Sequence, residues 1–489
     1  MDGTAGSCQQ RLPLLSMAKK KVRLVEDIEV IDIGDKGRAI GRAGDGRIVL
    51  VEKAVPGDII TGRVVQRKKG MWITVPEKFH KMSEDRVEPF CAHFGTCGGC
   101  KWQNLDYDKQ VYYKEKAVVD ALNRIAGLDD AEVLPILKCE TTTHYRNKLE
   151  YTFSGQRWLT VEEMNSDEEF NRNALGFHVP GSFARVVDIK KCYLQPDPSD
   201  AIRNRIRELS EEKGLQYQNI RDRSGLMRNV VIRNSTAGDV MLILVMIRDE
   251  PEARKIIFDD LKDRFPQIVS MYYCINAKLN DSTFDLPMHL YHGKTHLRQQ
   301  LGHVIFDLGP KSFFQTNPTQ AEALYEITTQ MADIGKEDLV FDLYCGIGSI
   351  SLYVANLARH VVGVEEVPEA IDDARRNAEL NGIENVDFFA GTARVVLQSE
   401  DFRRHGTPDI LITDPPRAGM HESVISSILK LAPKRIVYVS CNPSTQARDI
   451  KLLAEGYEFV RAQPVDMLPH TSHIENVTLL TRKAGYGLS

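Results

Sequence analysis

The 489-residue sequence contains no apolar run near the roughly 20 residues that a membrane-spanning helix needs. Its first residues do not show the basic, apolar and small-residue regions of a secretory signal in that order. It also has no repeat of fixed period and no low-complexity tract. These absences argue against a membrane protein, a secreted protein and a solenoid. We therefore expect a cytoplasmic protein without a membrane partner, and the sequence implies no protein partner.

Cysteine is scarce and its number is odd, because the chain has nine. This count suits metal-binding or catalytic thiols better than a disulfide framework. The composition is otherwise that of a globular protein, with 42% hydrophobic and 27% charged residues. A chain of this length is expected to form about three domains. Residues 1–16 fit poorly with the rest of the chain and Met17 is a more natural start, so we expect 1–21 to be disordered or an upstream extension.

Positive charge is concentrated in the first part of the chain. The net charge is −5, but residues 1–81 hold 16 Lys and Arg against 10 Asp and Glu, a net of +6. The remaining residues therefore carry −11. A basic module on an acidic body is typical of a protein that grips a phosphate backbone, although a solvated basic face explains the charge equally well.

Residues 22–81 are expected to form a small β-barrel. Four short strands are separated by glycine-rich turns, and there is room for a fifth near Ala39-Ile40, which predicts an OB-like fold. The stretches 37–42 and 55–58 resemble the TRAM domain, an RNA-binding barrel attached to RNA-modifying enzymes. This resemblance implies backbone contacts without base specificity from Arg38, Arg42, Arg47, Lys68 and Lys69.

Three cysteines then cluster in Cys91-Ala-His-Phe-Gly-Thr-Cys97-Gly-Gly-Cys100. Interleaved glycines let several thiolates converge on one centre, so the run predicts a metal site. Three ligands need a fourth, for which we favour Cys192 over Cys139. The spacing alone leaves a four-cysteine zinc site and an iron–sulfur cluster both open.

Residues 82–310 are expected to form an α+β central domain, in which strands and helices alternate. A strand over Tyr145–Phe153 would carry Arg146 and Lys148 on one face, as candidate RNA contacts. Arg228–Arg233 and Val240–Val245 are expected to be paired strands, and residues 104–127 have helical composition.

From Leu339 the sequence repeats strand–helix units, which predicts a Rossmann-like α/β domain over residues 311–489. A buried strand leads into Gly346 and Gly348 at the start of a helix, without the third glycine of the dinucleotide fingerprint. The next strand ends at Glu365, 19 residues after Gly346, where a carboxylate would meet the hydroxyls of a ribose. We expect S-adenosylmethionine here rather than NAD.

Three candidate catalytic residues lie at strand ends. Asp414 follows one predicted strand, and Cys441 follows the next, 27 residues later. Ligands bind at the carboxyl edge of such sheets, so a thiol there is a candidate nucleophile, although a lone cysteine is more often a small buried residue. Glu475 immediately precedes the last predicted strand.

Five motifs in fixed order carry a family resemblance: Ser312-Phe-Phe-Gln315, Asp342-Leu-Tyr-Cys-Gly-Ile-Gly-Ser349, Asp414-Pro-Pro-Arg417, Ser440-Cys441-Asn-Pro443 and His473-Ile-Glu475-Asn476. With the cysteine set, they closely resemble the RNA uracil-5-methyltransferases, in particular the iron–sulfur enzymes of 23S ribosomal RNA. The resemblance covers essentially Val22 to Arg482. It departs from some relatives at Ser349, where they have Asn.

The resemblance implies a class I methyltransferase that adds a methyl group to uracil C5. Cys441 would add to C6 as nucleophile, Glu475 would remove the C5 proton, and Asp414 would orient the base. It implies a [4Fe–4S] cluster on the four cysteines and a helical piece, 104–127, that packs on the catalytic domain. The implied S-adenosylmethionine contacts are Gln315, Tyr344, Glu365 and Asp414, beside the turn at Gly346 and Gly348.

Two alternatives stay open. The same reaction on transfer RNA would use the same motifs, because only the resemblance favours ribosomal RNA. A non-catalytic RNA-binding or ribosome-assembly protein is a second possibility, against which the intact Cys441, Asp414 and Glu475 argue.

Overall fold

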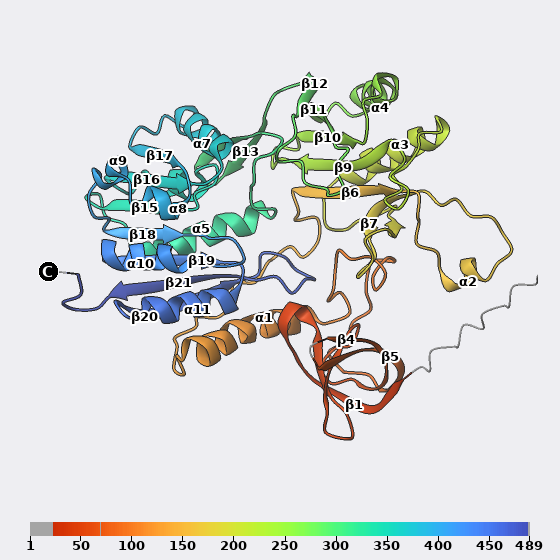
Figure 1. The fold of residues 1–489 in the computed structure, drawn as a ribbon, viewed down its shortest axis with the longest axis horizontal. Helices are drawn as coiled ribbons and strands as arrows, with labels where there is room; N and C mark the ends of the chain where they lie inside the picture. The colour runs from red at the N-terminus through yellow and green to blue at the C-terminus, as the bar shows by residue number, and fades with distance from the viewer. Residues whose placement is uncertain (1–22, 69, 488–489) are drawn as a thin grey trace, which may run out of the picture. The chain divides into compact units, whose positions relative to one another are not determined.

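The computed structural model describes residues 23–68 and 70–487 of the chain. The extension expected at residues 1–21 therefore lies outside the described residues. The chain falls into two compact units, one ending at Asp85 and one beginning at Arg86, and each is described by itself (Figure 1). No helix among the described residues is both long enough and apolar enough to cross a bilayer.

The first unit is a closed barrel of five strands in the order β1-β2-β3-β5-β4. β-branched side chains such as Ile28, Val49 and Ile60 are fully buried at its centre. Gly41 faces them, because a Cβ there would lie 2.4 Å from the Ile28 side chain. The expected barrel is confirmed. The additional strand for which the sequence left room near Ala39 is β2. The elements are β1 Leu24–Ile33, η1 Asp35–Gly37, β2 Ala39–Arg42, β3 Ile48–Val51, β4 Ile59–Lys68 and β5 Met71–Lys81.

The second unit contains two sheets of seven strands. The first has the order β12-β11-β10-β9-β6-β7-β8, and α3 and α4 contribute Ile206 and Phe258 to its core. The strands are β6 Lys148–Ser154, β7 Ala174–His178, β8 Val186–Asp188, β9 Met227–Asn234, β10 Val240–Met246, β11 Ile268–Ile275 and β12 His289–Gly293. The helices are α2 Val161–Met164, α3 Ser199–Glu212 and α4 Pro251–Arg264.

The strand pair expected near Arg228 and Val240 is present as the antiparallel pair β9 and β10. The strand expected from Tyr145, in contrast, begins only at Lys148. The preceding backbone bonds to other segments, since Arg146 N–H donates to the Leu194 carbonyl and Asn147 N–H to the Thr316 carbonyl. These bonds hold residues 146–147 outside the sheet ladder.

The other sheet has the order β17-β16-β15-β18-β19-β21-β20, in which β21 alone runs antiparallel to the other strands. Its strands are β15 Leu339–Leu343, β16 His360–Glu365, β17 Val386–Ala390, β18 Ile410–Thr413, β19 Arg435–Ser440, β20 Tyr457–Val465 and β21 Glu475–Arg482. The hairpin β13 Leu297–Leu301 and β14 Val304–Leu308 precedes it. The helices are α5 Pro318–Ala332, α6 Ser349–Val354, α7 Pro368–Leu380, α8 Ala393–Val396, α9 Glu400–Arg403, α10 Glu422–Leu431 and α11 Pro443–Leu453.

Helices cover both faces of this sheet, because its parallel strands are apolar on both sides. Val340 and Val437 belong to the core formed with α5, α6 and α7. Phe341 and Tyr438 belong to the core on the opposite face, with α10 and α11. The architecture is the doubly wound α/β arrangement that the repeating strand–helix pattern predicts.

One early helix packs against this C-terminal sheet. α1, Tyr107–Ala121, continues into the π-helix η2, Leu122–Ala126, which ends at Gly127 with φ of 76°. Val111, Val118 and Leu122 are buried in the same core as Ile450 and Leu453 of α11. Residues far apart in sequence therefore share one core beside β20 and β21.

Candidate active site

Asp414, Cys441 and Glu475 meet at the carboxyl edge of the C-terminal sheet. Asp414 follows β18 and Cys441 follows β19, and these two strands are parallel neighbours. Glu475 opens β21, whose next residue, Asn476, pairs with Ser440. The register thus brings Cys441 opposite Glu475, and all three side chains are half-buried.

The Cys441 thiol lies in a protein environment that opposes its ionisation. Burial raises its pKa to about 11, and the charges of Glu475 and Asp414 act in the same direction. Arg417 acts in the opposite direction, through its charge and a hydrogen bond. The Arg417 guanidinium is thus a cation beside this sulfur that favours the thiolate.

The two carboxyl groups are also perturbed. Burial raises the pKa of Asp414 to about 7, with a contribution from the charge of Asp342. Burial and the charge of Asp414 raise the pKa of Glu475 well above its usual range, against the effect of Arg417. A carboxyl group with a raised pKa is a stronger base than an exposed one and can hold or take a proton near neutral pH.

Arg417 and His473 are site residues that the sequence analysis did not select. The Arg417 Nη2 donates to Nδ1 of His473 at 2.9 Å. Burial and the charge of Arg417 lower the pKa of His473 to about 4, so its imidazole is neutral and accepts this bond. Both residues stand inside family motifs, Asp414-Pro-Pro-Arg417 and His473-Ile-Glu475, which is the signal that could have found them.

The main chain of Arg417 is fixed to the segment that follows Cys441. Its carbonyl accepts hydrogen bonds from Asn442 Nδ2 at 2.9 Å and from Thr445 Oγ1 at 3.2 Å. Asn442 also caps α11, since its side chain accepts from Ser444 N–H. The turn after β19 therefore positions both the thiol and the arginine beside it.

The glycine-rich turn after β15 has the backbone that a close approach of a ligand requires. Tyr344, Gly346 and Gly348 have φ of 67°, 56° and 77°. Gly346 has nothing within 4 Å of an added Cβ, whereas a Cβ on Gly348 would meet Phe388 at 2.9 Å. The turn thus leaves space at Gly346 and permits close packing at Gly348.

Two acidic residues at this turn fit a nucleoside ligand. The carboxylate of Glu365 is oriented by Gly346 N–H at 3.1 Å and by Val367 N–H at 3.0 Å. Asp342 is fully buried; its Oδ2 accepts from Ser351 Oγ at 2.6 Å, while its Oδ1 has no partner. An oriented carboxylate and an unpaired buried oxygen are available to polar groups of a bound ligand.

Gln315 precedes α5, and Ser349 is the first residue of α6. The main-chain carbonyl of Gln315 accepts from Asn147 Nδ2 at 3.1 Å, and its side chain is half-buried. Ser349 Oγ accepts from the buried Tyr325 hydroxyl at 3.0 Å. The charges of Asp414 and Glu475 help to raise the pKa of Tyr325. Tyr325 is therefore a further neighbour of the site that no sequence motif indicated. Cys345 is buried in the core.

The four candidate metal-binding cysteines lie around one cavity, whose lining includes Cys91, Cys97, Cys100 and Cys192. Burial raises the pKa of Cys97 to about 12 and that of Cys192 to about 11. The other three thiols also raise the pKa of Cys97, which shows that they are its electrostatic neighbours. Cys139 lies elsewhere, with its sulfur 3.5 Å from Asn317 Nδ2.

The candidate RNA-contact residues of the barrel are distributed over its surface. Arg42 and Lys68 are exposed, and Arg38 pairs with Glu52 at 3.2 Å. Arg47 stacks on Trp72 at 3.8 Å from the ring centre. Lys69 lies outside the described residues. Two arginines that the sequence analysis missed, Arg23 and Arg67, also face the Trp72 ring, at 4.1 and 5.0 Å.

Arg146 and Lys148 belong to the second unit and are half-buried. Burial and Arg233 lower the pKa of Lys148 to about 8. Arg146 acts electrostatically on both Cys100 and His473, so it is a neighbour of the cysteine cavity and of the site at the sheet edge. Its Nε is buried without a partner.

Comparison with known proteins identifies the family. The sequence model described as "tRNA (Uracil-5-)-methyltransferase" matches residues 294–483. An uncharacterized RNA methyltransferase of Bacteroides thetaiotaomicron is 46% identical, over 91% of this chain and 99% of its own. One of Porphyromonas gingivalis is also 46% identical, over 93% and 99%.

A solved structure has the same overall fold. The tRNA (uracil-54, C5)-methyltransferase of Pyrococcus abyssi, in complex with S-adenosyl-L-homocysteine, superposes with a TM-score of 0.71 at 28% identity. The match covers 92% of this chain and 99% of that one. The chain therefore belongs to the RNA (uracil-5-)-methyltransferase family, whose members are S-adenosylmethionine-dependent RNA methyltransferases.

Proposed function

We propose that this protein methylates C5 of a uracil in 23S ribosomal RNA by covalent catalysis through Cys441. The observation that carries the proposal is the meeting of Cys441, Glu475 and Asp414 beside Arg417 at one edge of the sheet. Uracil C5 is a poor nucleophile, and addition of a thiolate to C6 gives C5 the electron density that it needs.

Each residue has a step in this reaction. The Cys441 sulfur forms a bond to C6, and the ring electrons move to C5 and the adjoining carbonyl. S-adenosylmethionine supplies the methyl group when bound and leaves as S-adenosylhomocysteine. Glu475 then takes the C5 proton, and the electron pair of that C–H bond re-forms the C5–C6 double bond as the C6–sulfur bond breaks. Asp414 orients the base edge.

The turn after β15 fits the cofactor. Glu365 would bind the ribose hydroxyls, because backbone N–H groups already orient its carboxylate. Gly346 leaves space for a close approach. Tyr344 precedes it in the same turn, and the family resemblance adds Gln315 as a further contact. The Pyrococcus relative, solved with S-adenosyl-L-homocysteine, supports this assignment.

We infer that the four cysteines bind a [4Fe–4S] cluster rather than zinc. In a zinc tetrahedron with bonds of about 2.3 Å, the sulfurs stand about 3.8 Å apart. Among the described residues, three ligand atoms within 4.8 Å of one another occur at His360, Asp387 and His405, and not at these cysteines. The four thiols would hold the cluster through their deprotonated sulfurs, and its expected role is structural.

Two classes of RNA are candidates for the substrate. The four-cysteine set supports ribosomal RNA through the family resemblance. The Pyrococcus relative acts on uracil-54 of transfer RNA, which makes transfer RNA the second candidate. The basic barrel suits either, because its arginines around Trp72 can contact phosphates without reading bases.

A tritium-release assay tests the function. RNA labelled with tritium at uracil C5 loses the label to water only when C5 is substituted. We expect S-adenosylmethionine-dependent release from 23S ribosomal RNA and none from transfer RNA. Release from transfer RNA alone would identify the second candidate. RNA binding without release from either RNA would identify a non-catalytic RNA-binding protein.

A further inference from the structure

The segment 466–474, which connects β20 to β21, is held by an unusually complete set of hydrogen bonds. Each main-chain carbonyl from Asp466 to His470 accepts a bond from another part of the second unit. The donors, in order, are Gln320 at 2.9 Å, Asn317 at 3.0 Å, Lys114 at 3.0 Å, the Tyr145 hydroxyl at 2.9 Å and Lys101 N–H at 2.8 Å. This segment leads directly to His473 and Glu475.

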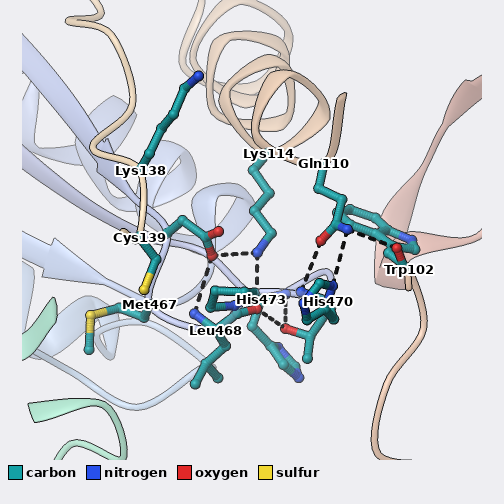
Figure 2. Close-up of polar contacts among 12 residues, drawn as sticks. Trp102, Gln110, Lys114, Lys138, Cys139, Met467, Leu468, His470 and His473 are labelled. Carbon is teal, nitrogen blue, oxygen red and sulfur yellow. Dashed lines mark hydrogen bonds and ion pairs between the residues drawn. The ribbon is translucent and has the colours of Figure 1, made fainter. Parts of the chain in front are cut away.

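A buried ion pair lies at the start of the segment. Lys114 of α1 reaches Asp466 Oδ1 at 2.5 Å, and both side chains are 0% exposed. The Tyr107 hydroxyl donates to the second carboxylate oxygen at 2.9 Å. Figure 2 shows the Lys114 side chain extending from its helix toward the segment that carries Leu468 and His470.

Stability alone is a weak reason for such a pair. Removing two charges from water costs about as much as their attraction returns, so an apolar pair of similar volume is often equally stable. The ion pair instead fixes the position of the segment, because the Lys114 ammonium binds both the Asp466 carboxylate and the Leu468 carbonyl.

Hydrogen bonds continue from this pair to the nucleophile. The Leu468 carbonyl also accepts from Thr471 Oγ1 at 2.7 Å, and that hydroxyl accepts from His473 N–H at 3.2 Å. The His473 ring then accepts from Arg417, the cation beside Cys441. Every link is a direct contact, from α1 to the edge of the sheet.

His473 is suited to hold an arginine. The charged groups that act on its ring are Arg417, Lys101, Arg146 and Lys114, all of them cations that disfavour its protonation. The neutral ring keeps a lone pair on Nδ1 for the guanidinium. Arg417 is itself exposed, and a long exposed side chain would otherwise spread over several rotamers.

We propose that Lys114 and Asp466 are positioning residues, which fix the segment 466–473 so that His473 holds the Arg417 guanidinium on the Cys441 thiol. The inference rests on the proposed function only in that Cys441 is the nucleophile. Glu475 and Asp414 oppose the thiolate and Arg417 favours it. Displacement of Arg417 therefore lowers the reactivity of the sulfur, while the cofactor turn is untouched.

The reactivity of Cys441 can be measured without RNA. The full-length protein is alkylated with iodoacetamide over a range of pH, and modification of the Cys441 peptide is followed by mass spectrometry. The variant Lys114→Met/Asp466→Asn removes both charges together, so that no buried charge is left unpaired. A rise of one unit in the thiol pKa would lower its thiolate fraction at pH 8 about tenfold and slow its alkylation severalfold.

We expect this slowing, with unchanged S-adenosylmethionine affinity, in the double variant, in Thr471→Val and in His473→Ala. Thr471→Val conserves shape and carries the test if the double variant does not fold. Lys116→Met is the matched control, because Lys116 lies on the same helix and pairs near the surface with Asp120 at 2.7 Å. It should leave Cys441 unchanged.

Wild-type reactivity of Cys441 in folded Thr471→Val and His473→Ala would overturn the proposal and leave the ion pair a structural role alone. Tritium release tests the proposed function separately. The variants could show slower alkylation while the wild type releases no tritium from any RNA. That result would retain the positioning role and reject the methyltransferase reaction.

Discussion

At the scale of single residues, the site is a thiol between two desolvated carboxyl groups and one guanidinium. Burial and the two acids raise the pKa of Cys441, and Arg417 opposes them. A thiol with a raised pKa is mostly protonated at neutral pH, and the protonated sulfur is a poor nucleophile.

Cys441→Ala should lower methylation by about 10³-fold or more, because no other described group at the sheet edge can add to C6. S-adenosylmethionine binding, measured by calorimetry, should be unchanged, since the glycine turn is intact. Substantial methylation by this variant would reject the covalent mechanism.

Glu475→Gln should stop the reaction after methyl transfer. The C5 proton would then stay in place, the C6–sulfur bond could not break, and a protein–RNA adduct would accumulate. The adduct is detected as a slower band in a denaturing gel, and it should be absent in the double variant with Cys441→Ala. Normal turnover by Glu475→Gln would mean that another group is the base.

The rate should rise with pH. The pKa of Cys441 is raised to about 11 and that of Asp414 to about 7, so both deprotonated forms gain population as pH increases through the neutral range. The thiolate fraction grows about tenfold per unit below its pKa. Single-turnover rates measured from about pH 6 to pH 9 should increase throughout, and a rate that falls over this range would contradict the electrostatics.

The sequence predicted the individual motif residues, but it did not predict which of their side chains contact one another. Cys441, Asp414 and Glu475 stand next to strand ends, so the sequence already indicated one edge. Arg417 and His473 stand in the same motifs, but nothing local shows that they bond to each other. Their contact depends on the order of β18, β19 and β21 in the sheet.

At the scale of elements, the turn between β15 and α6 is the most sharply defined part of the site. Three residues in five adopt positive φ, and one of them, Tyr344, is not glycine. The parallel neighbours β16 and β18 flank β15, so the turn opens at the carboxyl edge between them. The order of the strands therefore places the cofactor turn beside Asp414.

Gly348→Ala should weaken S-adenosylmethionine binding by about tenfold or more. A Cβ there would lie 2.9 Å from Phe388, and φ is 77°. Gly382→Ala is the matched control, with φ of 63° but nothing within 4 Å of an added Cβ. Both changes should cost about 1 to 2 kcal/mol of stability through φ alone. Equal affinity in the two variants would show that the turn tolerates a side chain.

At the scale of the whole molecule, the second unit joins the cysteine cavity to the catalytic edge. Lys101 and Trp102, which directly follow Cys100, donate their N–H groups to the His470 carbonyl. The cysteine segment and the segment before Glu475 are therefore held together. A group bound in the cavity would therefore help to fix the position of the segment before Glu475, and this effect needs no redox chemistry.

Cys192→Ser should abolish the proposed [4Fe–4S] cluster, whereas Cys139→Ser should retain it. Anaerobically purified protein is expected to hold about four iron and four sulfide ions per chain. Cys139 lies beside Asn317 and not at the cavity, so it is the matched control. A wild-type protein that contains one zinc ion per chain and no iron would identify the cavity as a zinc site.

The sequence by itself determined the barrel, the strand–helix repeats, the glycine turn and the identity of the three motif residues. These features follow from local torsional preferences and from the spacing of apolar side chains, which neighbouring residues encode. Only the tertiary structure decided that Cys192 joins the cysteine cavity, that His473 holds Arg417, and that Lys114 pairs with Asp466. Such contacts join residues up to 352 positions apart, and their strength comes from burial, which no local stretch of sequence specifies.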